Sequence, residues 1–168
     1  MLNAITLVSI AAFVAADQLI KYFVIRFLEP VGSAPFIPYL VKLTYVENSG
    51  AAFGSFSKYT VFLSIFTAVL LGFCLYFLLS GKIQKKLPRI AFILITAGGI
   101  GNLIDRVFRG YVIDYFDFLF MKFAVFNFAD SLVCIGAFLL ILYLIIDIVK
   151  ENKAQKASEQ TESKHADD

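Results

Sequence analysis

The chain has 168 residues, of which 60% are hydrophobic and 16% aromatic, and its formal net charge is +2. A mean hydropathy of +0.80 is too high for a soluble domain of this size, so the composition indicates an integral membrane protein. The cationic residues are scattered or lie near the C-terminus and form no stripe that could follow phosphates, which argues against nucleic-acid binding.

Four apolar segments are long enough, or nearly so, to cross a hydrocarbon core about 30 Å thick. They are Leu2–Phe27, Thr60–Leu79, Ile90–Ile104 and Phe128–Ile148. Lys and Arg are concentrated in cytoplasmic loops of membrane proteins, and here they follow the second and fourth segments. These cations are Lys82, Lys85, Lys86 and Arg89, and then Lys150, Lys153 and Lys156. We therefore predict that both termini are cytoplasmic and that residues 28–59 and 107–127 are extracytoplasmic.

The first segment contains two features that need separate interpretation. Val14-Ala15-Ala16 resembles a signal-peptide cleavage site, but no Lys or Arg precedes the apolar run and apolar residues continue beyond it. We therefore expect a retained span. Asp17 and Lys21 are four residues apart in the order that favours an ion pair within a helix, and a structural role explains them adequately.

The predicted extracytoplasmic segments contain two regions of β character. Residues 29–38 carry three prolines and a glycine and are expected to be irregular. Leu40–Val46 and Tyr111–Phe118 are rich in β-branched and aromatic residues, so we expect them to pair in a small sheet. The fold class predicted is an all-α integral membrane protein with four transmembrane helices and a small extracytoplasmic β-region. Residues 1–150 would form this domain, and the polar residues 151–168 a disordered cytoplasmic tail.

The cysteines and the single histidine limit the possible chemistry. Cys74 and Cys134 fall within predicted spans without CxxC spacing, so we interpret them as small buried hydrophobic residues. His165 lies in the polar tail, which argues against a Ser-His-Asp triad and a histidine-ligated metal. We expect no metal and no cofactor.

The third span carries a polar face. Gly98, Asn102, Asp105 and Arg106 recur at helical spacing, so one face ends in an amide, a carboxylate and a guanidinium. Neighbouring glycines should let another helix approach closely. Asp105 and Arg106 are explained by an interfacial anchor, or else the guanidinium fixes a carboxylate or holds a substrate carbonyl.

Asp114 and Asp130 each lie where a membrane helix should meet water. A carboxylate beside hydrocarbon is costly and persists mainly when it pairs, binds or reacts, and two such groups in one cavity can share a proton, as in aspartic proteases. Structural alternatives exist, since Asn127 could cap the last helix with Asp130 in its first turn, and Asp114 could be a polar strand end. Many polar groups nevertheless project to one end of the bundle, which favours a site. They are Asp17, Asn48, Asn102, Asp105, Arg106, Asp114, Asn127 and Asp130.

Five motifs resemble, in order, those of the bacterial lipoprotein signal peptidases, the signal peptidase II family. They are Asp17-Gln18-Leu19-Ile20-Lys21, Asn48-Ser49-Gly50-Ala51-Ala52-Phe53, Gly101-Asn102-Leu103-Ile104-Asp105-Arg106, Val112-Ile113-Asp114-Tyr115-Phe116 and Phe126-Asn127-Phe128-Ala129-Asp130-Ser131. The resemblance implies a membrane aspartic endopeptidase that cuts the signal peptide from prolipoproteins just before a diacylglyceryl-modified cysteine.

By this resemblance, Asp114 and Asp130 are the expected catalytic pair. The expected substrate-binding or supporting residues are Asn48, Asn102, Asp105, Arg106 and Asn127, and the expected structural pair is Asp17 and Lys21. The expected partners are diacylglyceryl-modified prolipoproteins and membrane lipid, at a site near the extracytoplasmic face of the bacterial cytoplasmic membrane. A further hypothesis is that Leu40–Val46 and Ala51–Phe56 close over the bound peptide.

Two other function classes stay open at this point. A small proton- or ion-coupled transport protein would need charge near the bilayer midplane, whereas the ionisable residues here lie mostly at span ends. A purely structural membrane scaffold would tolerate loss of either Asp114 or Asp130.

Overall fold

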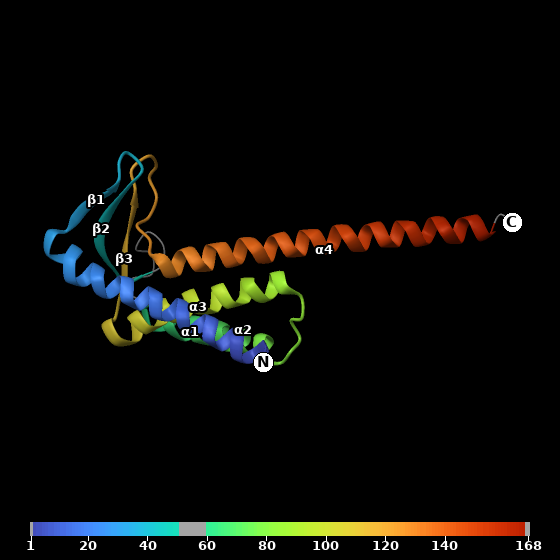
Figure 1. Ribbon diagram of the computed structural model, residues 1–168, viewed down its shortest axis with the longest axis horizontal. Coiled ribbons are helices and arrows are strands. Elements are labelled where there is room, and N and C mark those ends of the chain that lie inside the picture. Colours follow the sequence, from blue (N-terminus) through green and yellow to red (C-terminus); the bar gives the residue numbers. More distant parts are fainter. Residues whose placement is uncertain (1, 51–59, 167–168) are drawn as a thin grey trace.

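The computed structural model describes residues 2–50 and 60–166, and its four long helices lie along a common direction with a small sheet at one end (Figure 1). The helices are α1 Leu2–Phe23, α2 Thr60–Leu79, α3 Lys86–Arg109 and α4 Phe128–Ala166. Within the described residues, four helical stretches are long and apolar enough to cross a membrane, namely Asn3–Val31, Thr60–Leu79, Lys86–Arg109 and Phe128–Lys153. The predicted fold class is therefore confirmed.

Helix α3 is the centre of the bundle, because α1, α2 and α4 all pack against it. Two of its glycines explain how closely α4 and α1 approach. A Cβ atom at Gly98 would collide with the backbone carbonyl of Ala129, and one at Gly101 would lie 2.5 Å from the carboxylate of Asp17. The predicted role of the glycines in helix packing is confirmed.

The helix ends differ from the sequence prediction at three places. Helix α3 extends beyond Ile90–Ile104 at both ends, because Pro88 is tolerated in a first helical turn and the helix stops only at Gly110, whose φ is 82°. A π-helical turn, Val24–Leu28, extends α1. Helix α4 continues past the predicted span to Ala166. The tail contains no Gly or Pro and is rich in Ala, Lys, Gln and Glu, which favour helix.

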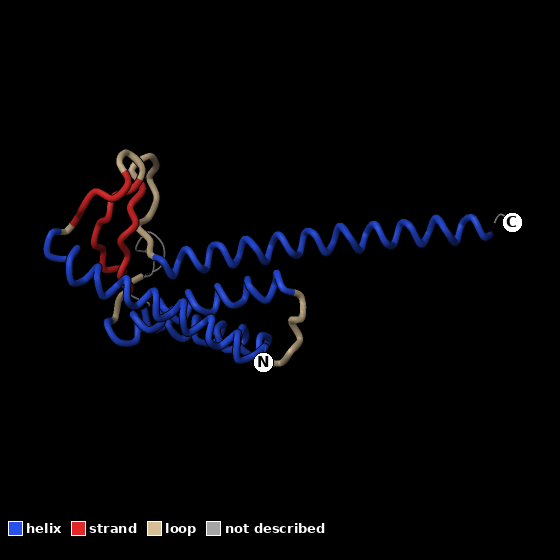
Figure 2. The backbone as a smooth tube through the Cα atoms, in the orientation of Figure 1, coloured by secondary structure: helices blue, strands red, loops and turns tan. Residues whose placement is uncertain are grey.

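Three antiparallel strands form the sheet, in the order β1-β2-β3. They are β1 Ser33–Ile37, β2 Val41–Asn48 and β3 Val112–Phe118, and they run across the direction of the helices (Figure 2). The two predicted strands are confirmed with shifted ends. The expectation that residues 29–38 are irregular was wrong for β1, because an edge strand accommodates Pro35 without losing a hydrogen bond in the sheet interior.

The strand register places a polar side chain beside Asp114. Val46 on β2 lies opposite Asp114 on β3, and the strands continue to a pairing of Asn48 with Val112. Since side chains two residues apart point to the same face of a strand, Asn48 lies diagonally across from Asp114 on one face. The sheet thereby brings residues from the first and third loops together at the end of the bundle.

Candidate active site

A buried ion cluster joins α1, α3 and α4 beneath the site. Lys21 Nζ lies 2.9 Å from Asp17 Oδ2 and 2.7 Å from Asp105 Oδ2, and all three side chains are fully buried. The remaining oxygen of Asp17 accepts the backbone N–H of Ala129 at 3.1 Å, and Asp105 Oδ1 lies 2.6 Å from Arg109 Nη1. Two carboxylates are thus matched by two cations, as buried charges require. The predicted Asp17–Lys21 ion pair is confirmed.

The cluster fixes the orientation of the Asn102 amide. Lys21 donates to Asn102 Oδ1 at 3.0 Å, and because an ammonium group can only donate, the amide oxygen must face it. The amide nitrogen is therefore directed away from Lys21, and it donates to Asp130 Oδ1 at 2.7 Å. Through this orientation of Asn102, the buried ammonium group of Lys21 on α1 determines which hydrogen-bond donor faces the carboxylate of Asp130 on α4.

Asn127 is both the cap of α4 and a contact of Asp114. Its Oδ1 accepts the backbone N–H of Asp130 at 2.9 Å, and Asp130 Oδ2 accepts the backbone N–H of Asn127 at 3.1 Å, as in a capping box. Its amide nitrogen then donates to Asp114 Oδ1 at 2.7 Å and to Asn102 Oδ1 at 3.1 Å. The capping interpretation is confirmed, and it coexists with a position in the polar site.

Asn48 holds the other oxygen of Asp114. Its Oδ1 accepts the backbone N–H of Gly50 at 3.0 Å, and its amide nitrogen donates to Asp114 Oδ2 at 2.8 Å. The hydroxyl of Tyr115 accepts the backbone N–H of Phe128 at 3.1 Å, which ties β3 to the start of α4. Three amides with fixed orientations therefore direct N–H groups at two carboxylates from different elements.

Asp114 and Asp130 line one cavity of about 540 Å³. Asp114 is almost fully buried, and Asp130 is half-buried. Burial raises the pKa of Asp114 from 3.8 to about 6, with a smaller increase from the nearby charge of Asp130, while the hydrogen bonds from Asn48 and Asn127 oppose the rise. Asp114 therefore titrates much closer to neutral pH than an ordinary aspartate.

The guanidinium of Arg106 also lines this cavity. Its Nη2 donates to the backbone carbonyl of Gly50 at 3.3 Å, while its buried Nε has no hydrogen-bond partner among the described residues. A buried donor without a partner is unusual, so Arg106 has capacity to bind an acceptor that enters the cavity. A second, apolar chamber of about 320 Å³ between α2, α3 and α4 also reaches Arg106 and Asp130.

The described structure gathers most of the expected site residues and separates one of them. Asn48, Asn102, Arg106, Asp114 and Asp130 line the cavity, and Asn127 lies behind Asp114 and Asp130. Asp105, expected among the substrate-binding or supporting residues, is not on the described cavity wall, because it is fully buried in the ion cluster. There it contacts Lys21, which in turn contacts Asn102. Asp17 and Lys21 lie in the same cluster.

Sequence reasoning did not identify the apolar part of the cavity wall. It includes Val112, Phe118, Phe123, Val125, Cys134 and Ile135. The prediction that Cys134 is buried was wrong, since its side chain is exposed on this wall, one helical turn after Asp130. Apolar residues fill every span, so the sequence alone provides no signal that distinguishes these. Residues 51–56, expected to close over a peptide, lie outside the described residues.

The four candidate spans and the cavity at one end of the bundle, which two carboxylates line, define the class: a multi-pass membrane protein with a candidate active site. A family model described as signal peptidase (SPase) II matches residues 9–146, and the chain belongs to this family. It is thus a bacterial membrane protease.

Individual relatives agree with this assignment. The lipoprotein signal peptidase of Caldanaerobacter subterraneus subsp. tengcongensis is 43% identical over 134 residues, which cover 80% of this chain and 91% of that protein. The lipoprotein signal peptidase of Streptococcus pyogenes serotype M2 is 39% identical and covers 81% of this chain and 90% of that protein. A bacterial membrane enzyme solved by the in meso method at 2.3 Å resolution has a TM-score of 0.79 at 34% identity, covering 86% of this chain and 90% of that one.

Proposed function

We propose that this protease is an aspartic endopeptidase that removes the signal peptide from diacylglyceryl-modified prolipoproteins, cutting just before the lipidated cysteine. The observation that carries the proposal is the pairing of Asp114 and Asp130 through Asn127, whose amide nitrogen donates to Asp114 while its backbone N–H donates to Asp130. Family membership and the names of the relatives support the prolipoprotein substrate.

In the proposed reaction the two carboxylates share one proton. The ionised one takes a proton from a water molecule as that water attacks the scissile carbonyl carbon. The protonated one donates a hydrogen bond to the carbonyl oxygen and later helps to protonate the leaving amine. Amide donors on both carboxylates stabilise the ionised form, and burial of Asp114 opposes it, so the protonation states belong to the coupled pair.

Arg106 and the apolar chamber are assigned to substrate binding. The Nε of Arg106, which has no hydrogen-bond partner among the described residues, would donate to a backbone carbonyl of the signal peptide. The chamber between α2, α3 and α4 has a mostly apolar lining on α2, and one of these residues, Leu70, is about half exposed on the bundle surface. Acyl chains of the substrate would remain in this apolar region while the peptide bond reaches the carboxylates.

The site would face the extracytoplasmic side of the membrane. The N-terminus and the α2–α3 connection lie at the end of the bundle opposite the sheet (Figure 1). That connection carries Lys82 and Lys85, so the positive-inside rule assigns it to the cytoplasm. An ion-coupled transport function is less well supported, because α2 contains no Asp, Glu, Lys or Arg and both site carboxylates lie at one end.

Selective cleavage of the lipidated precursor would test the function. In detergent and with a metal chelator present, we expect the enzyme to convert diacylglyceryl-modified prolipoprotein to a smaller species on a gel. The same precursor with its cysteine replaced by serine, which cannot carry the thioether lipid, should remain uncut. Equal cleavage of both precursors would contradict the proposed specificity, and loss of cleavage on chelation would contradict a metal-independent reaction.

The pH dependence should report the shared proton. Because the reaction needs one protonated carboxylate and burial raises the pKa of Asp114 to about 6, kcat/KM should fall as the pH rises above that region. The hydrogen bond from Asn48 lowers the pKa of Asp114, so its removal in Asn48→Leu should move the fall to higher pH. Asn3→Leu, which removes an amide at the opposite end of the bundle, is the matched control and should leave the midpoint unchanged. A midpoint that stays in place or moves down in Asn48→Leu would contradict the assignment of Asp114.

A further inference from the structure

The sheet extends sideways beyond the helical bundle and ends in two turns that face open space. Its strands run across the helix axes, and their far ends project past α4 (Figures 1 and 2). One turn joins β1 to β2, and the other follows β3. The backbone N–H of Leu119 donates to the carbonyl of Leu40 at 2.9 Å, so the two turns form one unit. We call this unit, residues 37–40 and 119–123, the sheet tip.

The sheet tip exposes large apolar side chains, although the ring of Phe120 also contacts the ring of Phe118, with centroids 5.2 Å apart. Tyr39 is 90% exposed and Phe120 is 61% exposed, and Leu40, Leu119 and Met121 are each about half exposed. Tyr39 also has a φ of 63°, a backbone conformation that glycine adopts more readily than tyrosine. At 90% exposure the aromatic side chain of Tyr39 makes little contact within this chain, so it is available to surroundings outside it.

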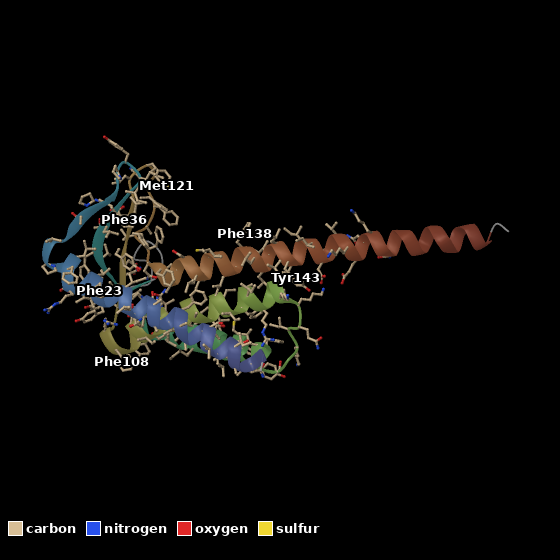
Figure 3. All side chains as sticks on the ribbon, viewed as in Figure 1. Phe23, Phe36, Phe108, Met121, Phe138 and Tyr143 are labelled. Atoms are coloured by element: carbon tan, nitrogen blue, oxygen red, sulfur yellow. The ribbon has the colours of Figure 1, made fainter. Side chains whose placement is uncertain are left out.

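The position of the sheet tip relative to the helices indicates which environment surrounds it. A helix of 24 residues, such as α3, is about 36 Å long and slightly exceeds a hydrocarbon core of about 30 Å. The sheet begins where α1 and α3 end, so it lies at the level of the lipid headgroups. The part of the sheet that extends past the helices therefore lies over lipid, on the α4 side of the bundle. Met121 is labelled in this part of the sheet in Figure 3.

The composition of the sheet tip matches that environment. Lys122 is exposed in the second turn. Lys42 on β2 lies 3.2 Å from Asp117, and the two lysines line one pocket at this end of the sheet, separate from the site cavity. Aromatic and aliphatic side chains with adjacent lysines are typical of segments that rest in the membrane interface, where the rings enter the acyl region and the ammonium groups reach phosphates.

We propose that the sheet tip is an interfacial anchor that inserts into the outer leaflet beside α4. Phe120, Met121 and Tyr39 would enter the boundary between headgroups and acyl chains, and Lys122 would bind lipid phosphate. The anchor would hold the sheet, and with it Asn48 and Asp114, at a constant depth relative to the membrane. This inference rests on geometry and exposure and does not depend on the proposed reaction.

Tryptophan fluorescence can test the proposal because the chain contains no tryptophan. Phe120→Trp would place a single reporter in the sheet tip of the full-length protein in vesicles that contain brominated phospholipids. We expect its emission to be quenched, most strongly by bromines close to the headgroup end of the acyl chain. Phe138→Trp, on the lipid-exposed face of α4 (Figure 3), should be quenched most strongly by bromines near the chain centre. Ser163→Trp, in the extension of α4 and ten residues beyond the end of the span at Lys153, or about 15 Å along a helix, should not be quenched.

The results that would overturn the proposal are distinct. Emission from Phe120→Trp that matches Ser163→Trp in every lipid would mean that the sheet tip is in water. A blue-shifted emission that no bromine quenches would mean that a protein surface covers the tip. Adding Lys122→Glu to Phe120→Trp should reduce the quenching, because a carboxylate is repelled by lipid phosphates. Unchanged quenching would remove Lys122 from the anchor.

Discussion

Asp114→Asn and Asp130→Asn, made as separate variants, should each lower the cleavage rate by roughly 10³-fold or more. Either change leaves one carboxylate, so no proton can be shared between two acids and one role in the proposed reaction is lost. The side chains remain nearly the same size, so the bundle should fold. The measurement is single-turnover cleavage of diacylglyceryl-modified prolipoprotein followed by gel shift.

The matched control for this experiment lies on the same strand as Asp114. Asp117 is half-buried on β3, pairs with Lys42 at 3.2 Å and accepts a hydrogen bond from Thr44 at 3.1 Å, and it is outside the wall of the site cavity. Asp117→Asn should therefore keep near-normal cleavage. Retained cleavage in both Asp114→Asn and Asp130→Asn would show that the catalytic residues lie elsewhere. Equal loss in Asp117→Asn would show that the effect is structural.

Lys21→Met should destabilise the protein by roughly 3–5 kcal/mol, the usual cost of leaving buried charge unpaired. Lys21 contacts Asp17 and Asp105, and all three side chains are fully buried. Lys21 also orients the Asn102 amide, which donates to Asp130. The variant should therefore melt at a lower temperature in detergent and cleave more slowly even where it is folded.

Lys85→Met tests whether this effect comes from burial. Lys85 Nζ lies 2.6 Å from Asp147 Oδ1, but this ion pair is exposed at the opposite end of the bundle, where water screens it. Thermal unfolding of the two variants in the same detergent should show a large decrease for Lys21→Met and little change for Lys85→Met. Similar melting temperatures would mean that the buried cluster contributes no more than a surface pair.

Local sequence patterns predicted the features that depend on neighbouring residues. Long apolar runs predicted the four spans because a helix must cover a membrane core with apolar side chains. The spacing of Asp17 and Lys21 predicted their ion pair, and Asn127 three residues before Asp130 predicted the cap of α4. Each of these depends on the geometry of one helix, which is nearly the same in every protein.

Predictions failed where distant parts of the chain decide the outcome. Asp105 carries the same charge as Asp114, and the residues around it do not show that it forms a buried ion pair with Lys21, 84 residues earlier, away from the cavity wall. β1 forms despite Pro35 because β2 is available as a partner. Cys134 lies in an apolar run, and only the packing of α3 and the sheet beside it leaves its side chain exposed on a cavity.

The sequence by itself determined the class of protein, the four spans and the polar residues that gather at one end, because hydrophobic length and periodicity are local properties of a chain. The motifs also pointed to the family that the comparisons then showed. Only the tertiary structure decided how the amides are turned. Asn48, Asn102 and Asn127 each direct their nitrogen at a carboxylate because another group, from Gly50, Lys21 or Asp130, occupies the amide oxygen. An amide is symmetric in shape but not in hydrogen bonding, so its direction depends on partners that folding brings together.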